Sequence, residues 1–153
     1  MSSNYWLLVI SPENFRITLD QGFNVQGFPT SQRRKAERME VGDRLLFYIN
    51  RARLFAVTTT ITSTYFEEHS RLWTSHDARE TYPYRVLIEP TVVLEEDDYL
   101  NAYQIGPRME YIKKWVPEMW PLALQGDLHI LSRRDFSMIE DEMKKLVSAK
   151  AKR

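Results

Sequence analysis

Aromatic side chains that stand beside polar or basic residues are the groups of this chain best suited to binding chemistry. Many of them fall near the ends of predicted strands, and the set is Trp6, Phe28, Tyr48, Tyr65, Phe66, Trp73, Tyr82, Tyr84, Trp115 and Trp120. A flat ligand held between rings, with backbone groups at its edge, is the arrangement that recognises a single or flipped nucleobase. One base–aromatic stack contributes about 1–3 kcal/mol, so two rings closing on one base would form a binding site.

Trp73 differs from the other aromatic residues because it falls in a polar stretch, "HSRLWTSHD", close to Arg71. A large aromatic side chain in such a loop either folds back onto the core or is exposed for a flat ligand, and the sequence favours neither. Trp6 lies within an apolar run and is more typical of a core residue. Tyr48, inside "LLFYI", fits either role.

A basic cluster, Arg33, Arg34, Lys35 and Arg38, is a candidate surface for the phosphates of a nucleic acid. The net charge of the chain is zero, which argues against extensive non-specific coating of DNA but allows a local phosphate-binding face. A solvated helix face is an equally good interpretation of the cluster. A second basic group near the C-terminus is better explained as solvation of a helix; it contains Lys144, Lys145, Lys150, Lys152 and Arg153.

Several kinds of catalytic chemistry are excluded or disfavoured. The absence of cysteine excludes a disulfide scaffold, a thiolate metal site and a cysteine nucleophile. The chain has no Gly-rich phosphate loop, no GxSxG elbow and no HExxH motif. His69 and His76 share one loop, but a hydrated pair is more typical there than a metal site. Glu67, Glu68 and residues 95–98 ("EEDD") are interpreted as solvent-facing charges. We therefore predict no catalytic residue, no metal and no cofactor.

The elements that would position these groups begin with a strand. "YWLLVIS" (residues 5–11) is a mostly apolar run of strand length, which predicts a buried first strand. Ser11 and Pro12 then predict a helix start, with Ser11 as N-cap and Pro12 at the first helical position, and the helix should end near Gly22. "NVQGFP" (residues 24–29) predicts a turn or short strand in which Gly27 can adopt a positive φ. Residues 30–39 predict a second short helix, capped by Thr30 or Ser31.

The middle of the chain predicts strands and the end predicts a helix. "VGDRLLFYI" (residues 41–49) reads as a turn and strand, joined through residues 50–53 to a long partner strand over residues 52–66. A polar loop (residues 67–81) precedes the strand "YRVLIEPTVVL", which should be interrupted at Pro90. Residues 132–147 predict a helix that begins with a variant capping box, Ser132 with Asp135. Its apolar stripe is Phe136, Ile139, Met143 and Leu146.

This order of elements predicts an α+β protein with a mixed sheet or small barrel, and without βαβ alternation. No repeat or linker divides the chain, so we expect one domain over residues 1–147 followed by a basic tail, residues 148–153. The apolar run at residues 5–10 is too short to span a membrane and has no basic segment before it. We therefore expect a cytoplasmic protein with no membrane partner.

Several of these segments, in this order, resemble the EVE-domain family, which belongs to the PUA-like fold group and is related to the YTH readers of methylated adenine. They are "YWLLVISPENF", "NVQGFP" with its short basic helix, "VGDRLLFYI", "SRLW" and "ETYPYRV". The similarity extends from about Tyr5 to the final helix, and it is greatest to a small archaeal-type branch of the family. The resemblance implies a pseudo-barrel of five to six strands with flanking helices. It also implies a pocket at one end that binds a modified base of DNA or RNA without performing chemistry.

The resemblance also implies which residues line that pocket. The end of the first strand and the following turn supply one wall, "NVQGFP" supplies the next, and the polar loop with the "TYPYR" segment completes it. The residues are Ile10, Ser11, Pro12, Asn14, Asn24, Val25, Gln26, Gly27, Phe28, Arg71, Trp73, Tyr82, Tyr84 and Arg85.

Two positions depart from the family pattern. Many relatives have a lysine where this chain has Ile10, and many have a tryptophan at or beside the position of Gln26. Phe28 or Trp73 could replace the missing ring, and Gln26 could form a hydrogen bond to a base edge. A second hypothesis is a small PUA-like hydrolase of a modified nucleoside, which would need a titratable group in the pocket. A third is an interaction module whose aromatic residues all belong to the core.

Overall fold

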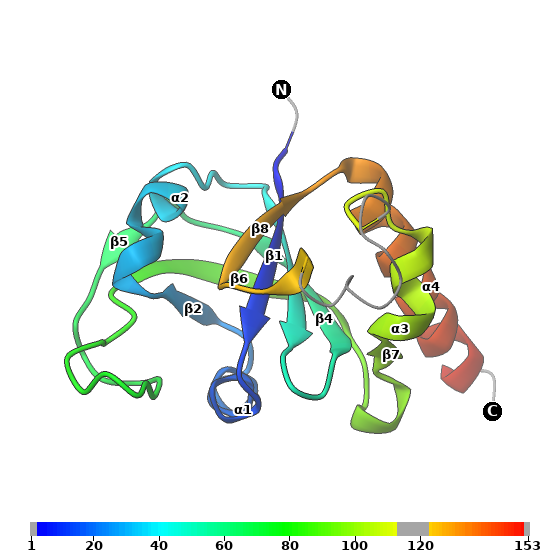
Figure 1. Ribbon diagram of the computed structural model, residues 1–153, viewed down its shortest axis with the longest axis horizontal. Helices are drawn as coiled ribbons and strands as arrows, with labels where there is room; N and C mark the ends of the chain where they lie inside the picture. The colour runs from blue at the N-terminus through cyan, green and yellow to red at the C-terminus, as the bar shows by residue number, and fades with distance from the viewer. Residues whose placement is uncertain (1–2, 113–122, 152–153) are drawn as a thin grey trace.

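One curled sheet runs through the computed structural model, which describes residues 3–112 and 123–151 (Figure 1). Along the sheet its main strands follow the order β2-β6-β4-β3-β1-β8. Their bounds are β1 Tyr5–Ile10, β2 Val25–Phe28, β3 Arg44–Ile49, β4 Leu54–Ile61, β6 Tyr84–Val93 and β8 Leu128–Leu131. Two short strands join its sides, β5 (Phe66–Glu67) on β6 and β7 (Leu100–Asn101) on β4.

The sheet is mixed, as the sequence predicts. β1 pairs parallel to β3, with Tyr5 opposite Arg44, whereas the other pairings are antiparallel. The parallel pairing needs a crossover, because a tight turn can join only antiparallel neighbours. The crossover carries α1 (Pro12–Asp20), β2, the 3₁₀ turn Thr30–Gln32 and α2 (Arg33–Glu37). The prediction of an α+β pseudo-barrel with flanking helices is confirmed, and its main path has six strands.

Both faces of the central strands are buried, which explains why β1 is apolar without alternation. Trp6, Leu8 and Ile10 belong to one core cluster, inside the curl of the sheet, together with residues of α1 and α2. Leu7 and Val9 belong to a second cluster, which packs against α3 (Ala102–Ile105) and α4 (Arg133–Ala151) on the other face. Figure 1 shows α3 and α4 together on one side of the sheet, away from β2 and α2.

The predicted starts of the first and last helices are confirmed. Ser11 caps α1, where its Oγ accepts a hydrogen bond from the backbone N–H of Asn14 at 3.1 Å. Ser132 does the same for α4 through the N–H of Asp135 at 3.1 Å. The Asp135 carboxylate does not return to Ser132 as in a full capping box; it accepts from the backbone N–H groups of Glu110 and Tyr111. Phe136, Ile139 and Met143 of the predicted stripe are buried, and α4 continues to Ala151.

Three local predictions are wrong. Neither Thr30 nor Ser31 caps a helix, because both the N–H and the hydroxyl of Thr30 donate to the Glu80 carboxylate. Gly27 does not adopt a positive φ; it lies within β2. Pro90 does not interrupt its strand, because β6 passes it with a register shift between Thr58 and Thr59 of β4. A bulge accommodates a proline that cannot donate to the ladder.

The predicted long strand after the hairpin is also shorter than expected, since β4 ends at Ile61 and Phe66 belongs to β5. No helix in the described ranges is both long and apolar enough to cross a membrane. Trp115, Trp120, Lys152 and Arg153 lie outside the described residues.

Candidate functional site

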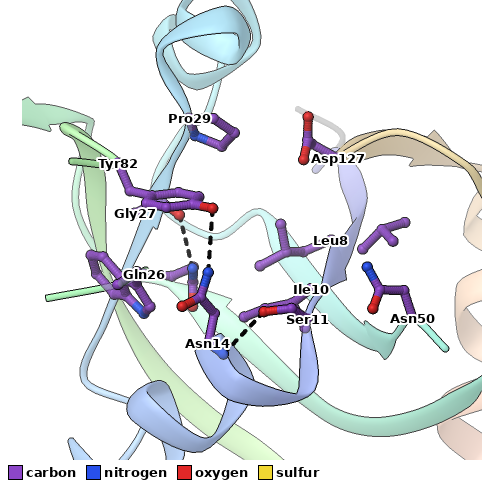
Figure 2. Close-up of a pocket in the computed structure, with 12 residues that line it drawn as sticks. Leu8, Ile10, Ser11, Asn14, Gln26, Gly27, Pro29, Asn50, Tyr82 and Asp127 are labelled. Carbon is purple, nitrogen blue, oxygen red and sulfur yellow. Dashed lines mark hydrogen bonds between the residues drawn. The ribbon is translucent and has the colours of Figure 1, made fainter. Parts of the chain in front are cut away.

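A cavity of about 110 Å³ lies where β2, at one edge of the sheet, approaches β1 and β8 at the other edge (Figure 2). In Figure 2, Tyr82, Gln26 and Asn14 lie on one side, Leu8, Ile10 and Asn50 lie across from them, and Asp127 and Pro29 lie at one end. The full lining is Leu8, Val9, Ile10, Ser11, Asn14, Gln26, Gly27, Pro29, Asn50, Trp73, Tyr82 and Asp127. One water needs only about 10–15 Å³, so the cavity has room for a group of several heavy atoms.

The start of α1 fixes one wall through Asn14. The side-chain nitrogen of Asn14 donates to the carbonyl of Thr74 at 2.9 Å and to the hydroxyl of Tyr82 at 3.3 Å. Its side-chain oxygen accepts from the N–H of Thr74 at 2.8 Å and from the Thr74 hydroxyl at 3.1 Å. An amide has two donors and two acceptor sites, so this set uses all of them. Asn14 therefore positions the loop and Tyr82 and leaves no polar group for a ligand.

Trp73 forms a second wall and is fully buried. Its indole Nε1 donates to the Thr18 hydroxyl at 2.9 Å, and this hydroxyl donates to Oε1 of Gln26 at 2.8 Å. The Gln26 side-chain nitrogen donates to the carbonyl of Gly27 at 2.8 Å. This chain fixes the indole ring and the orientation of the Gln26 amide. Only one of the two N–H groups of Gln26 has a partner among the described residues, so the other remains for a ligand.

Position 27 requires a glycine, because the Tyr82 backbone and the Trp73 ring both lie very close to it. A Cβ at this position would lie 2.5 Å from the carbonyl oxygen of Tyr82 and 2.6 Å from Cζ3 of Trp73. Tyr82 itself has a φ of 51°, which is uncommon for a residue other than glycine. The two rings meet edge to face, with centroids 6.2 Å apart. Gly27 thus allows both rings to sit against β2 as adjoining walls.

Arg85 stabilises the loop between β5 and β6, which carries Trp73 and Tyr82. It is 2% exposed, and its guanidinium lies 5.1 Å from the centre of the Trp73 ring. It donates to the carbonyls of Tyr82 and Thr81, each at 3.1 Å, and to both the carbonyl and the hydroxyl of Ser70. Burial lowers the pKa of Arg85, but an arginine stays protonated in proteins. The fork of donors matches several carbonyls at once, so Arg85 fixes the backbone between Ser70 and Tyr82.

Two polar groups of the cavity lining have no hydrogen-bond partner among the described residues. The Asn50 side-chain oxygen is buried and accepts no hydrogen bond. The Asp127 carboxyl accepts none either, and burial raises its pKa above the ordinary value, with Glu80 adding to the shift. The lining therefore combines ring walls with a few polar groups that a ligand can satisfy.

Seven of the residues predicted for a base pocket line this cavity: Ile10, Ser11, Asn14, Gln26, Gly27, Trp73 and Tyr82. The other seven lie elsewhere. Phe28 and Tyr84 are buried in the core, and Arg85 lies behind Trp73. Asn24 is exposed and donates to the Gln21 carbonyl, while Arg71 is exposed and donates to the Ala78 carbonyl. Pro12 begins α1 and lines a groove on its other side, and Val25 begins β2.

The predicted phosphate-binding residues divide into two pairs. Arg33 pairs with Glu37 and lies over the Tyr84 ring, at 5.7 Å from its centre. The Lys35 ammonium donates to the Leu128 carbonyl at 2.6 Å, which joins α2 to β8. Arg34 and Arg38 are exposed on α2 and just after it, and neither guanidinium has a hydrogen bond or ion pair within the described ranges. These two side chains are free to contact phosphates.

Sequence reasoning missed the polar residues of the lining that come from turns, Asn50 and Asp127. Asn50 reads as a hairpin residue and Asp127 follows Gly126 as a turn residue would, so neither carries a signal of its own. Aromatic type was the informative signal, because it singled out Trp73 and Tyr82. No group of three or more histidine, aspartate or glutamate side chains within the described residues is placed to hold a metal ion.

The sheet and its flanking helices belong to the fold class of the YTH domains. The structure matches a complex of the YTH domain-containing protein Mmi1 with RNA at a TM-score of 0.67, with 10% identity, over 99% of this chain and 87% of that chain. It also matches a hypothetical protein from Leishmania major at a TM-score of 0.63, with 16% identity, over 95% of this chain and 97% of that one.

The chain itself belongs to the EVE domain family, whose model matches residues 4–113. Two archaeal relatives cover nearly its whole length. The UPF0310 protein of Pyrococcus abyssi is 24% identical over 146 residues, which are 90% of this chain and 97% of that protein. The UPF0310 protein of Pyrococcus horikoshii is 25% identical over 147 residues, 89% and 96% of the two chains. The resemblance seen in the sequence, including its archaeal branch and its relation to YTH domains, is confirmed.

Proposed function

We propose that this protein is a non-enzymatic, cytoplasmic nucleic-acid-binding module that takes one modified or flipped base into the cavity between Trp73 and Ile10. The observation that carries the proposal is the construction of the cavity. It is a small space with aromatic and aliphatic walls, and its polar groups are held in place by buried hydrogen bonds. A flat, partly polar ring is the ligand that such a lining suits.

The positions of the basic residues support the same function. Arg34 and Arg38 follow β2 and Pro29, which border the cavity, and they offer free guanidinium groups. Contacts to phosphates add affinity and fix orientation without reading sequence, which complements a pocket that reads one base. The fold relative Mmi1 has been solved with RNA, which agrees with a nucleic-acid partner for this fold.

The test is binding of labelled single- and double-stranded oligonucleotides, as DNA and as RNA. Each probe carries N6-methyladenine, 5-methylcytosine or only unmodified bases, and binding is followed by fluorescence anisotropy at moderate salt. We expect at least one modified probe to bind more tightly than its unmodified counterpart. Replacement of the Trp73 wall should then weaken binding about 5- to 150-fold, the range that corresponds to one base–aromatic stack.

Trp73→Ala removes a fully buried side chain, so Trp73→Phe is made in parallel to keep a ring and preserve folding. Trp6→Phe is the matched control, because Trp6 is also fully buried and donates through its indole nitrogen, to Asp43 at 3.0 Å, but does not line the cavity. It should leave binding unchanged. Failure of every probe to bind at moderate salt would refute the proposal.

Asp127 favours a second candidate function, a hydrolase of a modified nucleoside. This reaction needs a titratable group in the pocket, and the carboxyl of Asp127 lines the cavity with a raised pKa. The test is turnover of a panel of acylated and methylated nucleosides by the wild-type protein and by Asp127→Asn. Product formation that Asp127→Asn abolishes would favour the hydrolase over the binding module.

A further inference from the structure

The cavity adjoins a wider space, the outer chamber, of about 380 Å³. Ser11, Asn14, Asn50 and Tyr82 line both spaces, so they form the junction between them. The remaining residues of the outer chamber are Glu13, Arg51, Thr74, Ser75 and His76. The outer chamber thus adds hydroxyl, carboxylate, imidazole and guanidinium groups to the residues that it shares with the inner cavity.

Asn50 carries the unsatisfied polar atom of this junction. Its backbone N–H donates to the carbonyl of Ile10 at 2.9 Å, which anchors the residue beside the end of β1. Its side-chain oxygen is buried, and no described residue donates to it. A buried acceptor without a donor is costly, and a ligand that supplies the donor recovers that cost as affinity.

The part of a nucleotide that would occupy this junction is its sugar. When a base fills the inner cavity, the glycosidic bond must pass the four shared residues, and the ribose then lies in the outer chamber. We propose that Asn50 reads the ribose 2′-hydroxyl, so that the module selects RNA over DNA; this inference rests on the proposed function above. A hydroxyl both donates and accepts, so it satisfies the Asn50 amide whichever of its two polar atoms faces the junction.

The chemistry of the outer chamber agrees with a ribose. The pKa of Glu13 is lowered by a hydrogen bond from its own backbone N–H, and Arg51 lowers it further, so its carboxylate is ionised. Arg51 contacts this carboxylate at 3.2 Å. An ionised carboxylate accepts hydrogen bonds from sugar hydroxyls, as the acidic residue of dinucleotide-binding folds does. Arg51 and His76 then provide cationic or donor groups for the adjoining phosphate.

The test compares four versions of the oligonucleotide that binds best in the panel above. They are all-RNA, all-DNA, RNA with one 2′-deoxy nucleotide at the recognised base, and RNA with a 2′-O-methyl group there. We expect the single 2′-deoxy change to weaken binding of the wild-type protein about fivefold to tenfold, as for one lost hydrogen bond. Asn50→Ala should weaken binding of the all-RNA probe to the same level and remove the difference between the RNA and single-deoxy probes.

Asn101→Ala is the control, because it removes the same side-chain amide from a residue that lies outside both spaces, where the Asn101 oxygen accepts from the N–H of Tyr103 at 2.8 Å. It should retain the preference for RNA. Equal binding of RNA and single-deoxy probes by the wild-type protein would overturn the inference and leave the proposed function intact. An equal loss for both probes in Asn50→Ala would show that Asn50 reads the base edge instead. Absence of binding to every probe would overturn both proposals.

Discussion

At the scale of single residues, the site depends on side chains that hold others in place. Gly27 is the clearest case, since any Cβ would collide with the carbonyl of Tyr82 and the ring of Trp73. We expect Gly27→Ala to lower the free energy of unfolding by about 2 kcal/mol, as overpacking does, and to weaken base binding by displacing both rings. Urea-induced unfolding and the anisotropy assay measure the two effects.

Gly22→Ala is the appropriate comparison for this change. Gly22 has a φ of 77°, and a Cβ there would meet only the Asn24 side chain, at 3.6 Å or beyond. The substitution should therefore cost about 1 kcal/mol through backbone strain and leave binding unchanged. Equal binding losses in the two variants would mean that Gly27 acts through overall stability and not through the cavity walls.

At the scale of elements, the loop between β5 and β6 has little regular structure and depends on one buried cation. Arg85 contacts the loop through Ser70, Thr81 and Tyr82, and it stacks against Trp73. Arg85→Lys keeps the charge but loses the planar fork, so we expect the loop to open locally. Hydrogen exchange at residues 70–82 should become faster, while exchange in β3 and β4 stays slow. Arg79→Lys, at an exposed arginine of the same loop, should change the exchange rates neither at residues 70–82 nor in β3 and β4.

Elements that local chemistry determines could be predicted from the sequence, and the rest could not. The apolar run of β1, the Ser11–Pro12 start of α1 and the stripe of α4 each contain their own signal. The prediction that Thr30 caps a helix was wrong because Glu80, fifty residues away, accepts from the N–H and the hydroxyl of Thr30. For the same reason, residue type revealed Trp73 and Tyr82, but Asn50 and Asp127 join the site only through the folding of distant turns.

At the scale of the whole molecule, the curled sheet carries one core inside its curl and another beneath α4. The Glu140 carboxylate of α4 joins the helix to the sheet, because it accepts from Arg44 of β3 and from the Thr58 hydroxyl of β4 at 2.6 Å. Its side chain is 8% exposed. The inner wall of the cavity comes from β1, the neighbour of β3, so this contact supports the strands that carry the site.

The pH dependence of stability follows from this contact. Burial raises the pKa of Glu140, but the hydrogen bonds from Arg44 and Thr58 and the charge of Arg44 outweigh it, so the pKa lies below its ordinary value of 4.5. A carboxyl whose pKa is lower in the folded state contributes stability above its unfolded pKa, and that contribution is lost as the pH falls through the folded pKa. We expect Glu140→Gln to lower the free energy of unfolding by about 1.5–3 kcal/mol at pH 7, the range for hydrogen bonds to a charged group.

The loss should shrink as the pH falls below about 4.5, because the wild-type carboxyl then becomes protonated too. Urea-induced unfolding of both proteins at a series of pH values between 7 and 3 measures this difference directly. Glu142→Gln is the matched control, two residues along the same helix, where the carboxylate pairs with Arg108 and Lys145 at the surface. It should cost less than about 1 kcal/mol at any pH. A loss in Glu140→Gln that stays constant from pH 7 to pH 3 would show that packing, and not the charge of Glu140, joins α4 to the sheet.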